Sequence, residues 1–249
     1  MHLSLIVGCI VSLAYVVMEV FPHKMFDGVP YNRWIETYSM SQIQTIFFLI
    51  FPILAAMSMS DMFYCDKKSG YLNYIIAKGE KKHYFRSLYI GNFVVGGLSV
   101  LIPLILNLYC CFMLLTNRGP DMPSDAAVNV TFDDPLTIFP HLYYSHPMLH
   151  VVMYLLIDFF TGAFFATLAL CGSFFIKHRL FVVILPFIFS YLVSSLARHA
   201  IALRNFVPEQ FTQQLGGVNS LLAVLSFLGI GFLILSLLYR WCVKKKSVL

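Results

Sequence analysis

One carboxyl group stands out because of its surroundings: Asp158 lies within the apolar run Leu149–Ile176. It is about nine residues into that run, or roughly 13 Å along a helix, which places it near the middle of a bilayer. An ionisable group at that depth is costly, so it marks either a transport pathway or a protonated group bonded between helices. Tyr154, Thr161 and Gly162 share its helical face, which is polar and small, as helix contacts in membranes tend to be. The sequence leaves both roles open.

The histidines and cysteines offer weaker possibilities. His146 and His150 are four residues apart at the start of the same run, a spacing that can direct two imidazoles to one metal ion. Pro147 lies between them and no third ligand is fixed, so we favour a structural role and predict no metal site. The cysteines fall in apolar runs or at their ends, without zinc-type spacing, and we interpret them as small hydrophobic residues.

These side chains must be positioned by membrane helices. Of 249 residues, 59% are hydrophobic and 12% are charged, and the mean hydropathy is +0.78. A soluble domain carries about twice that share of charge. The Lys and Arg residues form no basic face of a soluble domain, so no nucleic acid is expected as a partner. We predict an all-α integral membrane protein in which residues 1–249 form a single transmembrane domain in the lipid bilayer. Six runs are long enough to cross about 30 Å of hydrocarbon, at about 3–21, 41–64, 88–115, 149–176, 180–201 and 219–241.

Basic residues are distributed unevenly between these spans. The loops after the second and fourth spans, together with the C-terminal end, carry 12 of the 17 Lys and Arg residues. The positive-inside rule therefore predicts that both termini are cytoplasmic. The segment Thr116–Met148 is then outside, Pro22–Met40 is an outer linker whose Trp34 suits the interfacial aromatic belt, and Ala202–Gly217 is a short re-entrant or interfacial element.

The inner loop after the second span carries the most informative pattern. Asp66 and a Gly-Tyr pair precede a short apolar stretch that ends at Gly79, and a basic-aromatic segment leads into the next span. This pattern predicts a short amphipathic helix closed by a glycine. Positive-inside charge beside a surface helix explains it in general terms. A coupling helix that docks into a soluble partner explains it more specifically, and its docking residues would be Asp66, Gly70, Tyr71, Leu72, Ile75 and Ile76.

This loop resembles the one between the second and third spans of type-2 ABC exporter permeases. The resemblance covers most of the chain: six spans, a second inner loop reduced to Lys177–Arg179, and a Pro-containing outer element between the fifth and sixth spans. Two features depart from the family pattern. The chain starts almost at its first span, where family members usually have a basic amphipathic helix, and Thr116–Met148 is longer than the usual outer loop.

The resemblance implies a permease subunit of an ATP-driven exporter in a bacterial cell membrane. No Gly-x4-Gly-Lys-Ser/Thr motif occurs in the chain, so we expect no catalytic residues and no cofactor here. A separate ABC ATP-binding subunit would bind ATP and Mg, and a second permease, identical or a sibling, would complete the pathway as a dimer. The acidic outer segment and Phe-rich spans favour an amphipathic or cationic peptide as cargo, as in export of antimicrobial or toxin peptides or in self-immunity.

Two other classes of function stay open. A non-transporting membrane anchor or signalling subunit would need no docking helix. An intramembrane enzyme would need a second catalytic group facing Asp158, and the sequence places no other such group clearly at that depth.

Overall fold

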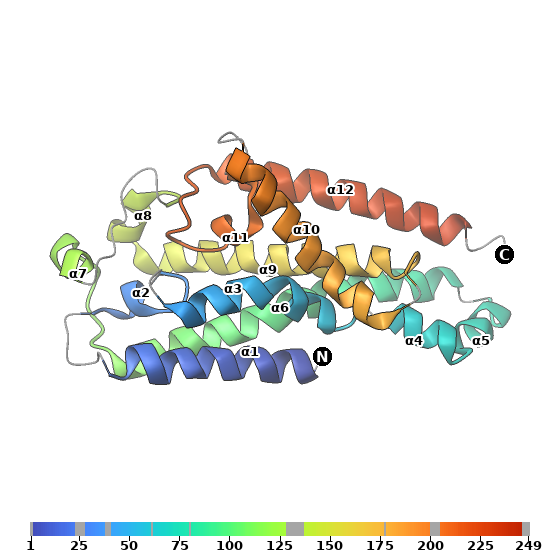
Figure 1. Ribbon diagram of the computed structural model, residues 1–249, viewed down its shortest axis with the longest axis horizontal. Helices are drawn as coiled ribbons and strands as arrows, with labels where there is room; N and C mark the ends of the chain where they lie inside the picture. The colour runs from blue at the N-terminus through green and yellow to red at the C-terminus, as the bar shows by residue number, and fades with distance from the viewer. Residues whose placement is uncertain are drawn as a thin grey trace.

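The computed structural model describes residues 2–22, 28–37, 41–60, 62–79, 81–127, 137–176, 178–199 and 205–245, except the side chains of Lys67, Asn73, Ile76, Ser124 and Ala127. Within these residues all regular secondary structure is helical. Six helices are long and apolar enough to cross a membrane, which confirms the prediction of an all-α, multi-pass membrane protein. The long helices lie side by side along the longest axis of the molecule, with α10 crossing them obliquely (Figure 1).

The six spans are close to the predicted ones. The first combines α1 (His2–Tyr15) with a π-helical turn η1 (Val16–Val20), and the second is α3 (Gln42–Met57), followed by α4 (Met62–Lys68). The others are α6 (Lys81–Leu114), α9 (Pro147–Gly172), α10 (Arg179–His199) and α12 (Leu221–Lys245). The third span begins earlier than predicted, because its basic-aromatic leader continues the helix beyond the apolar run.

The central contact joins α6 and α9 through small residues. A methyl group added at Gly96 would collide with the side chain of Ala166, and one at Gly97 would lie 2.5 Å from the ring of Phe159. One added at Gly162 would lie 2.5 Å from Val100. The two backbones therefore approach closely, as small residues allow in membrane helix pairs. We call this contact the glycine seam.

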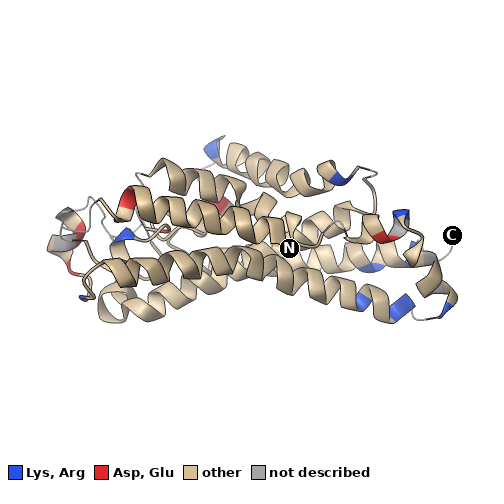
Figure 2. Cartoon of the chain, turned by 90° about the horizontal axis from the view of Figure 1, so that it is seen from below, with Lys and Arg blue, Asp and Glu red and all other residues tan. Residues whose placement is uncertain are grey.

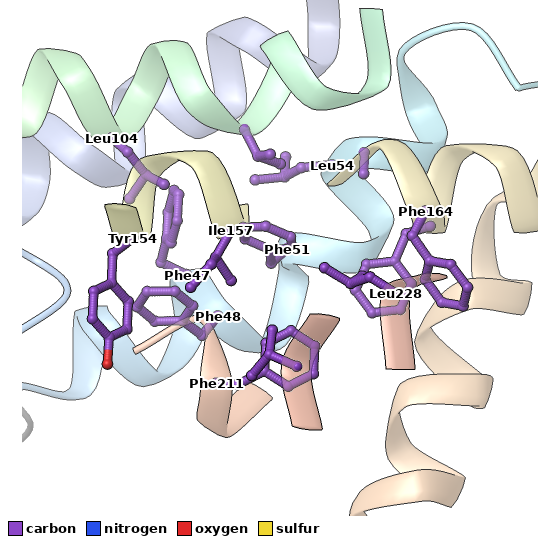
Figure 3. Close-up of a cluster of buried hydrophobic side chains, with 14 of the residues drawn as sticks. Phe47, Phe48, Phe51, Leu54, Leu104, Tyr154, Ile157, Phe164, Phe211 and Leu228 are labelled. Carbon is purple, nitrogen blue, oxygen red and sulfur yellow. The ribbon is translucent and has the colours of Figure 1, made fainter. Parts of the chain in front are cut away.

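Aromatic side chains fill the space between α9 and its other neighbours. Phe47, Phe48 and Phe51 project from α3, and Phe51 meets Phe165 of α9 at a ring distance of 6.3 Å. Figure 3 shows the cluster with Leu54, Ile157 and Phe211 nearby. Edge-to-face and stacked rings of this kind add to the dispersion energy that holds helices together in lipid.

The short helices lie at the two ends of the molecule. One end holds α2 (Pro30–Arg33), α7 (Met122–Ala127) and α8 (Pro140–Ser145), with α11 (Pro208–Phe211) on the same side (Figure 1). We call it the α7 end. The opposite end, the α5 end, holds α4, α5 (Tyr71–Ala77) and the last turns of α12. Lys and Arg gather at the α5 end, and Asp and Glu are more frequent toward the α7 end (Figure 2). That the α5 end faces the cytoplasm stays a prediction.

Candidate functional site

Asp158 meets a second carboxyl group in the interior of the protein. It lies on α9 with its side chain fully buried, and the fully buried carboxyl group of Glu36 is close enough to interact with it directly. Glu36 comes from the segment between α2 and α3, which we predicted to be an outer linker. The side chain of Gln214, also fully buried, completes the group next to Glu36. We call Glu36, Asp158 and Gln214 the carboxyl cluster.

Glu36 is buried because its segment folds into the α7 end of the bundle. The backbone N–H of Ile35 donates to the side-chain oxygen of Asn107 on α6 at 3.0 Å. Asn107 in turn donates to the carbonyl oxygen of Ser12 on α1 at 3.1 Å. The hydroxyl of Tyr15 donates to the carbonyl oxygen of Arg33 at 2.8 Å. Hydrogen bonds from α1 and α6 thus satisfy the backbone of an irregular segment inside the protein, as burial in a membrane requires.

The same segment buries Trp34, which we predicted to lie in the interfacial aromatic belt. We expected this ring at the membrane interface, but its side chain is fully buried within the bundle. The expectation was wrong because it treated the segment as a surface linker. The other tryptophan, Trp241 on α12, is half-exposed at the α5 end, with the Nζ of Lys245 5.1 Å from its ring centre.

The element between the fifth and sixth spans covers the cluster. After α11 the chain turns back, and the backbone N–H of Gln214 donates to the carbonyl oxygen of Glu36 at 3.2 Å. Phe211 anchors this turn: its ring is fully buried and lies 5.7 Å from the ring of Phe227 on α12. Close backbone contact also fixes the turn at Gly216, since a Cβ there would collide with the backbone of Gln210. The element is therefore part of the packed α7 end.

Burial dominates the electrostatics of the cluster. It raises the pKa of the Glu36 carboxyl well above its usual range, the neighbouring carboxyl of Asp158 raises it further, and a hydrogen bond from Gln214 opposes the rise. None of these groups is a cation. The polar contacts within the cluster are long or poorly aligned, since none of the four carboxyl oxygens has a partner of good hydrogen-bond geometry in the described part of the chain. Two buried carboxyl groups that face each other disfavour ionising together, which favours a state in which the pair holds at least one proton.

The chemistry available to this cluster is proton binding. Two carboxyl groups and one amide offer too few oxygen ligands for Ca²⁺, which takes about six to eight. Among the described residues no group of three or more His, Cys, Asp or Glu side chains could hold a metal ion. A shared proton needs no further ligand, and its loss would place one or two negative charges in a buried site. The cluster therefore links protonation to the packing of α9 against the α7 end.

The two histidines near the start of α9 lie in different environments. His150 is buried, with its Nε2 atom 3.1 Å from the carbonyl oxygen of Ile138, while His146 is exposed at the start of the helix. The hydroxyl of Tyr154 accepts from the N–H of Ile138 at 3.1 Å and lies 3.1 Å from the hydroxyl of Thr137. His150 and Tyr154 thus belong to one network that fastens the segment before α8 to α9.

The short helix predicted after the second span is present as α5, and its docking to a partner stays a prediction. Its predicted apolar face is only partly exposed. Tyr71 is half-exposed and stacks with the exposed ring of Tyr74 at 6.4 Å, whereas Leu72 packs partly buried against the core. Ile75 is partly buried, and the side chain of Ile76 lies outside the described residues. The exposed face is therefore aromatic. Tyr74 was missed because the prediction selected only consecutive apolar pairs.

The ends of α5 follow from two glycines and one hydrogen bond. Gly70 (φ 79°) and Gly79 (φ 76°) flank the helix in left-handed conformations, and nothing lies near the position of an added Cβ at either residue. Asp66 accepts a hydrogen bond from the hydroxyl of Tyr84 at 2.6 Å, which fastens α4 to the start of α6. Asp66 thus ties α4, which precedes α5, to α6, and the rings of Tyr71 and Tyr74 stay exposed.

Comparison with known proteins does not assign the chain to a family. No family model, no curated protein and no solved structure matches the chain. The function therefore has to be argued from the architecture, from α5 and from the carboxyl cluster.

Proposed function

We propose that this chain is the permease subunit of an ATP-driven ABC exporter. It would work with a separate ATP-binding subunit, which binds ATP and Mg, and with a second permease in a bacterial cell membrane. The observation that carries the proposal is α5: a short helix between the second and third of six apolar helices, flanked by left-handed glycines, with an exposed aromatic pair among basic residues.

The position of α5 suits the transmission of force from a soluble motor. Its main contacts within the described chain are with α4, which follows the second span, and with α6, the third span. The bond between Asp66 and Tyr84 holds these two elements together. A partner that moved α5 would therefore move both spans, and α6 would carry the movement to α9 through the glycine seam. Asp158, the member of the carboxyl cluster on α9, would respond.

Removing the exposed aromatic pair tests the docking step. Tyr71→Asp/Tyr74→Asp is expected to abolish co-purification of a Walker-motif ATPase with the tagged permease from membranes of its native host. A matched control is Met122→Asp on α7, equally accessible at the opposite end with 68% exposure. Tyr71→Phe/Tyr74→Phe should retain the ATPase. An ATPase that still co-purifies with the aspartate variant, or no ATPase with the unaltered chain, would refute the proposal.

Sidedness provides a separate test. In a background without native cysteines, a cysteine at exposed Met122 should react with an impermeant maleimide on intact cells, and one at exposed Lys68 only after lysis. The reverse pattern would place the α5 end outside, where no ATPase could reach it.

The cargo follows from charge and stays a prediction. Asp121 is exposed and Asp125 is buried at the α7 end, and the chain contains 24 Phe residues. An acidic exit favours an amphipathic or cationic peptide, as in antimicrobial or toxin peptide export or self-immunity. Host cells that lack the chain should become more sensitive to a cationic peptide and no more sensitive to an anionic one.

One observation favours a second candidate, an intramembrane enzyme. Glu36 supplies the carboxyl group facing Asp158 that the sequence did not offer, and paired carboxyls with one proton are a known acid–base device. Both groups are fully buried, however, so a substrate would reach them only after the α7 end opened. Hydrolysis of a membrane peptide that is lost in both Glu36→Gln and Asp158→Asn would favour this candidate over transport.

A further inference from the structure

A basic groove lies between α6 and α12 at the α5 end. It encloses about 760 Å³, within the usual range of small-molecule sites. Each helix contributes one face, with residues spaced three or four apart. The lining residues are Lys81, Lys82, Phe85, Arg86 and Tyr89 from α6, and Ser236, Tyr239, Arg240, Val243 and Lys244 from α12.

The floor of the groove is aromatic and fixed. The hydroxyl of Tyr239 donates to the carbonyl oxygen of Phe85 at 2.8 Å, and both side chains are buried. The ring of Tyr89 lies 5.0 Å from that of Tyr239. This hydrogen bond and these ring contacts join the two helices behind the groove, so the site is formed without a ligand.

The rim of the groove is strongly cationic. Among the ten described residues that line it, five are Lys or Arg and none is acidic. Asp66 is the acidic residue that the described chain places at this end, and the hydroxyl of Tyr84 already engages it. The first turn of α6 and the last turn of α12 both border the groove, so their opposite helix-dipole charges offset each other and the basic side chains supply its positive charge. Like charges so close together repel each other, and a bound anion would relieve that repulsion.

The position of the groove beside exposed apolar side chains indicates which kind of anion it would bind. It lies at the ends of two membrane-spanning helices, and the next turns toward the membrane centre expose Ile90 and Val94 on α6 and Leu233 and Leu237 on α12. A ligand with a phosphate at the rim and acyl chains along these side chains would use both surfaces. We propose that the groove binds the headgroup phosphate of an anionic phospholipid. This site requires only a bilayer and does not depend on the proposed exporter function.

Retention of lipid by the full chain tests the site. The chain is reconstituted in phosphatidylcholine nanodiscs with a minor fraction of phosphatidylglycerol, re-extracted, and its retained lipids are quantified by mass spectrometry. Arg86→Gln/Arg240→Gln should retain about 10- to 30-fold less phosphatidylglycerol, given the usual contribution of each basic residue. Lys68→Gln/Arg179→Gln removes the same charge at the same end outside the groove and should match the unaltered chain. Arg86→Lys/Arg240→Lys should keep most of the lipid.

Two further arms identify the source of the phosphate. Inorganic phosphate at the same concentration should not displace the lipid, since it gains nothing from the apolar surface, and raised ionic strength should weaken retention. Displacement by inorganic phosphate would assign the groove to a soluble anion and overturn the lipid assignment. Equal losses in the groove and control variants, or none in either, would overturn it as well. If Arg86→Gln/Arg240→Gln does not fold, the salt dependence of lipid retention by the unaltered chain tests the site: retention that does not weaken at raised ionic strength would overturn the proposal.

Discussion

The two ends of this molecule treat polar groups in opposite ways. At the α7 end, polar side chains are buried and bonded across distant segments: Asn32 donates to Asp125 at 2.8 Å, and the hydroxyl of Tyr143 donates to the same oxygen at 3.3 Å. At the α5 end, Tyr71 and Tyr74 are exposed, and the described residues that line the groove at this end include five Lys or Arg and no acid.

The difference predicts which kind of change each end responds to. Buried polar groups need specific partners, so the α7 end is sensitive to any change in those partners or in protonation. Exposed aromatic rings and clustered positive charge would gain from an external partner, so the α5 end suits the binding of a protein or of lipid that we propose. We therefore expect substitutions at the α7 end to affect stability, and those at the α5 end to affect binding.

The largest expected effect is at Asp158. Asp158→Leu should destabilise the protein by about 3 kcal/mol, because it leaves the Glu36 carboxyl without its partner and changes the shape of a packed site. Asp158→Asn keeps the shape and the hydrogen-bonding capacity and should cost less than about 1 kcal/mol. Thermal denaturation followed by tryptophan fluorescence measures both.

Activity then separates the two roles of this residue. If Asp158→Asn transports normally while Asp158→Leu fails to assemble, Asp158 is structural. Two variants that assemble and do not transport would assign it to the pathway or its switch. If Asp158→Leu assembles and transports normally, the carboxyl cluster influences neither assembly nor transport.

The next effect concerns pH. Burial raises the pKa of Glu36, so the folded protein binds its proton more tightly than the unfolded chain does. Stability is therefore complete below the ordinary glutamate value of about 4.3 and decreases as pH rises from there toward the raised pKa, by at most about 1.4 kcal/mol per unit for one proton. Glu36→Gln should reduce this slope. Denaturation temperatures across pH 4 to 9 test it, and a glutamine variant with an unchanged slope would contradict the assignment.

A smaller effect is expected at the link between α2 and α7. Asn32→Ala removes the donor to Asp125 and the acceptor of the Val29 N–H, which lies 2.9 Å away, and should cost about 2 kcal/mol. Tyr143→Phe is the control: it removes only the longer bond to Asp125 and should cost less than about 1 kcal/mol. Faster hydrogen exchange in α7 is expected only in the first variant, and equal exchange in both would show that the link is not specific.

The smallest effect is expected at the α5 end. Gly79→Ala places a side chain at a left-handed position and should cost about 1 kcal/mol, confined to the exchange rates of α5. Gly229→Ala on α12 also meets open space but has no positive φ, so it should be neutral or slightly stabilising. A large global loss of stability in Gly79→Ala would mean that the α5 end is as tightly built as the α7 end.

The elements of this fold were predictable to different degrees. Long apolar runs determined the six spans, and Gly79 marked the end of α5, because these signals are local. Glu36 was not predictable, since its burial depends on hydrogen bonds from Asn107 and Tyr15, far away in sequence. The exposure of Tyr74 likewise depends on which side of α5 packs on its neighbours. Asp158 was recognised from its depth, but its partner came from outside the spans.

The glycine seam has a mechanical consequence. Helices whose backbones touch at Gly96, Gly97 and Gly162 cannot slide or rotate against each other without separating along much of their length. The pair α6 and α9 therefore behaves as one rigid body, in which the two helices keep the same relative position. Among the candidate spans, α10 and α12 have the smallest buried share. In the proposed exporter, α6 and α9 would then move together as one body relative to these peripheral helices, and a cross-link between α6 and α9 should leave that movement intact.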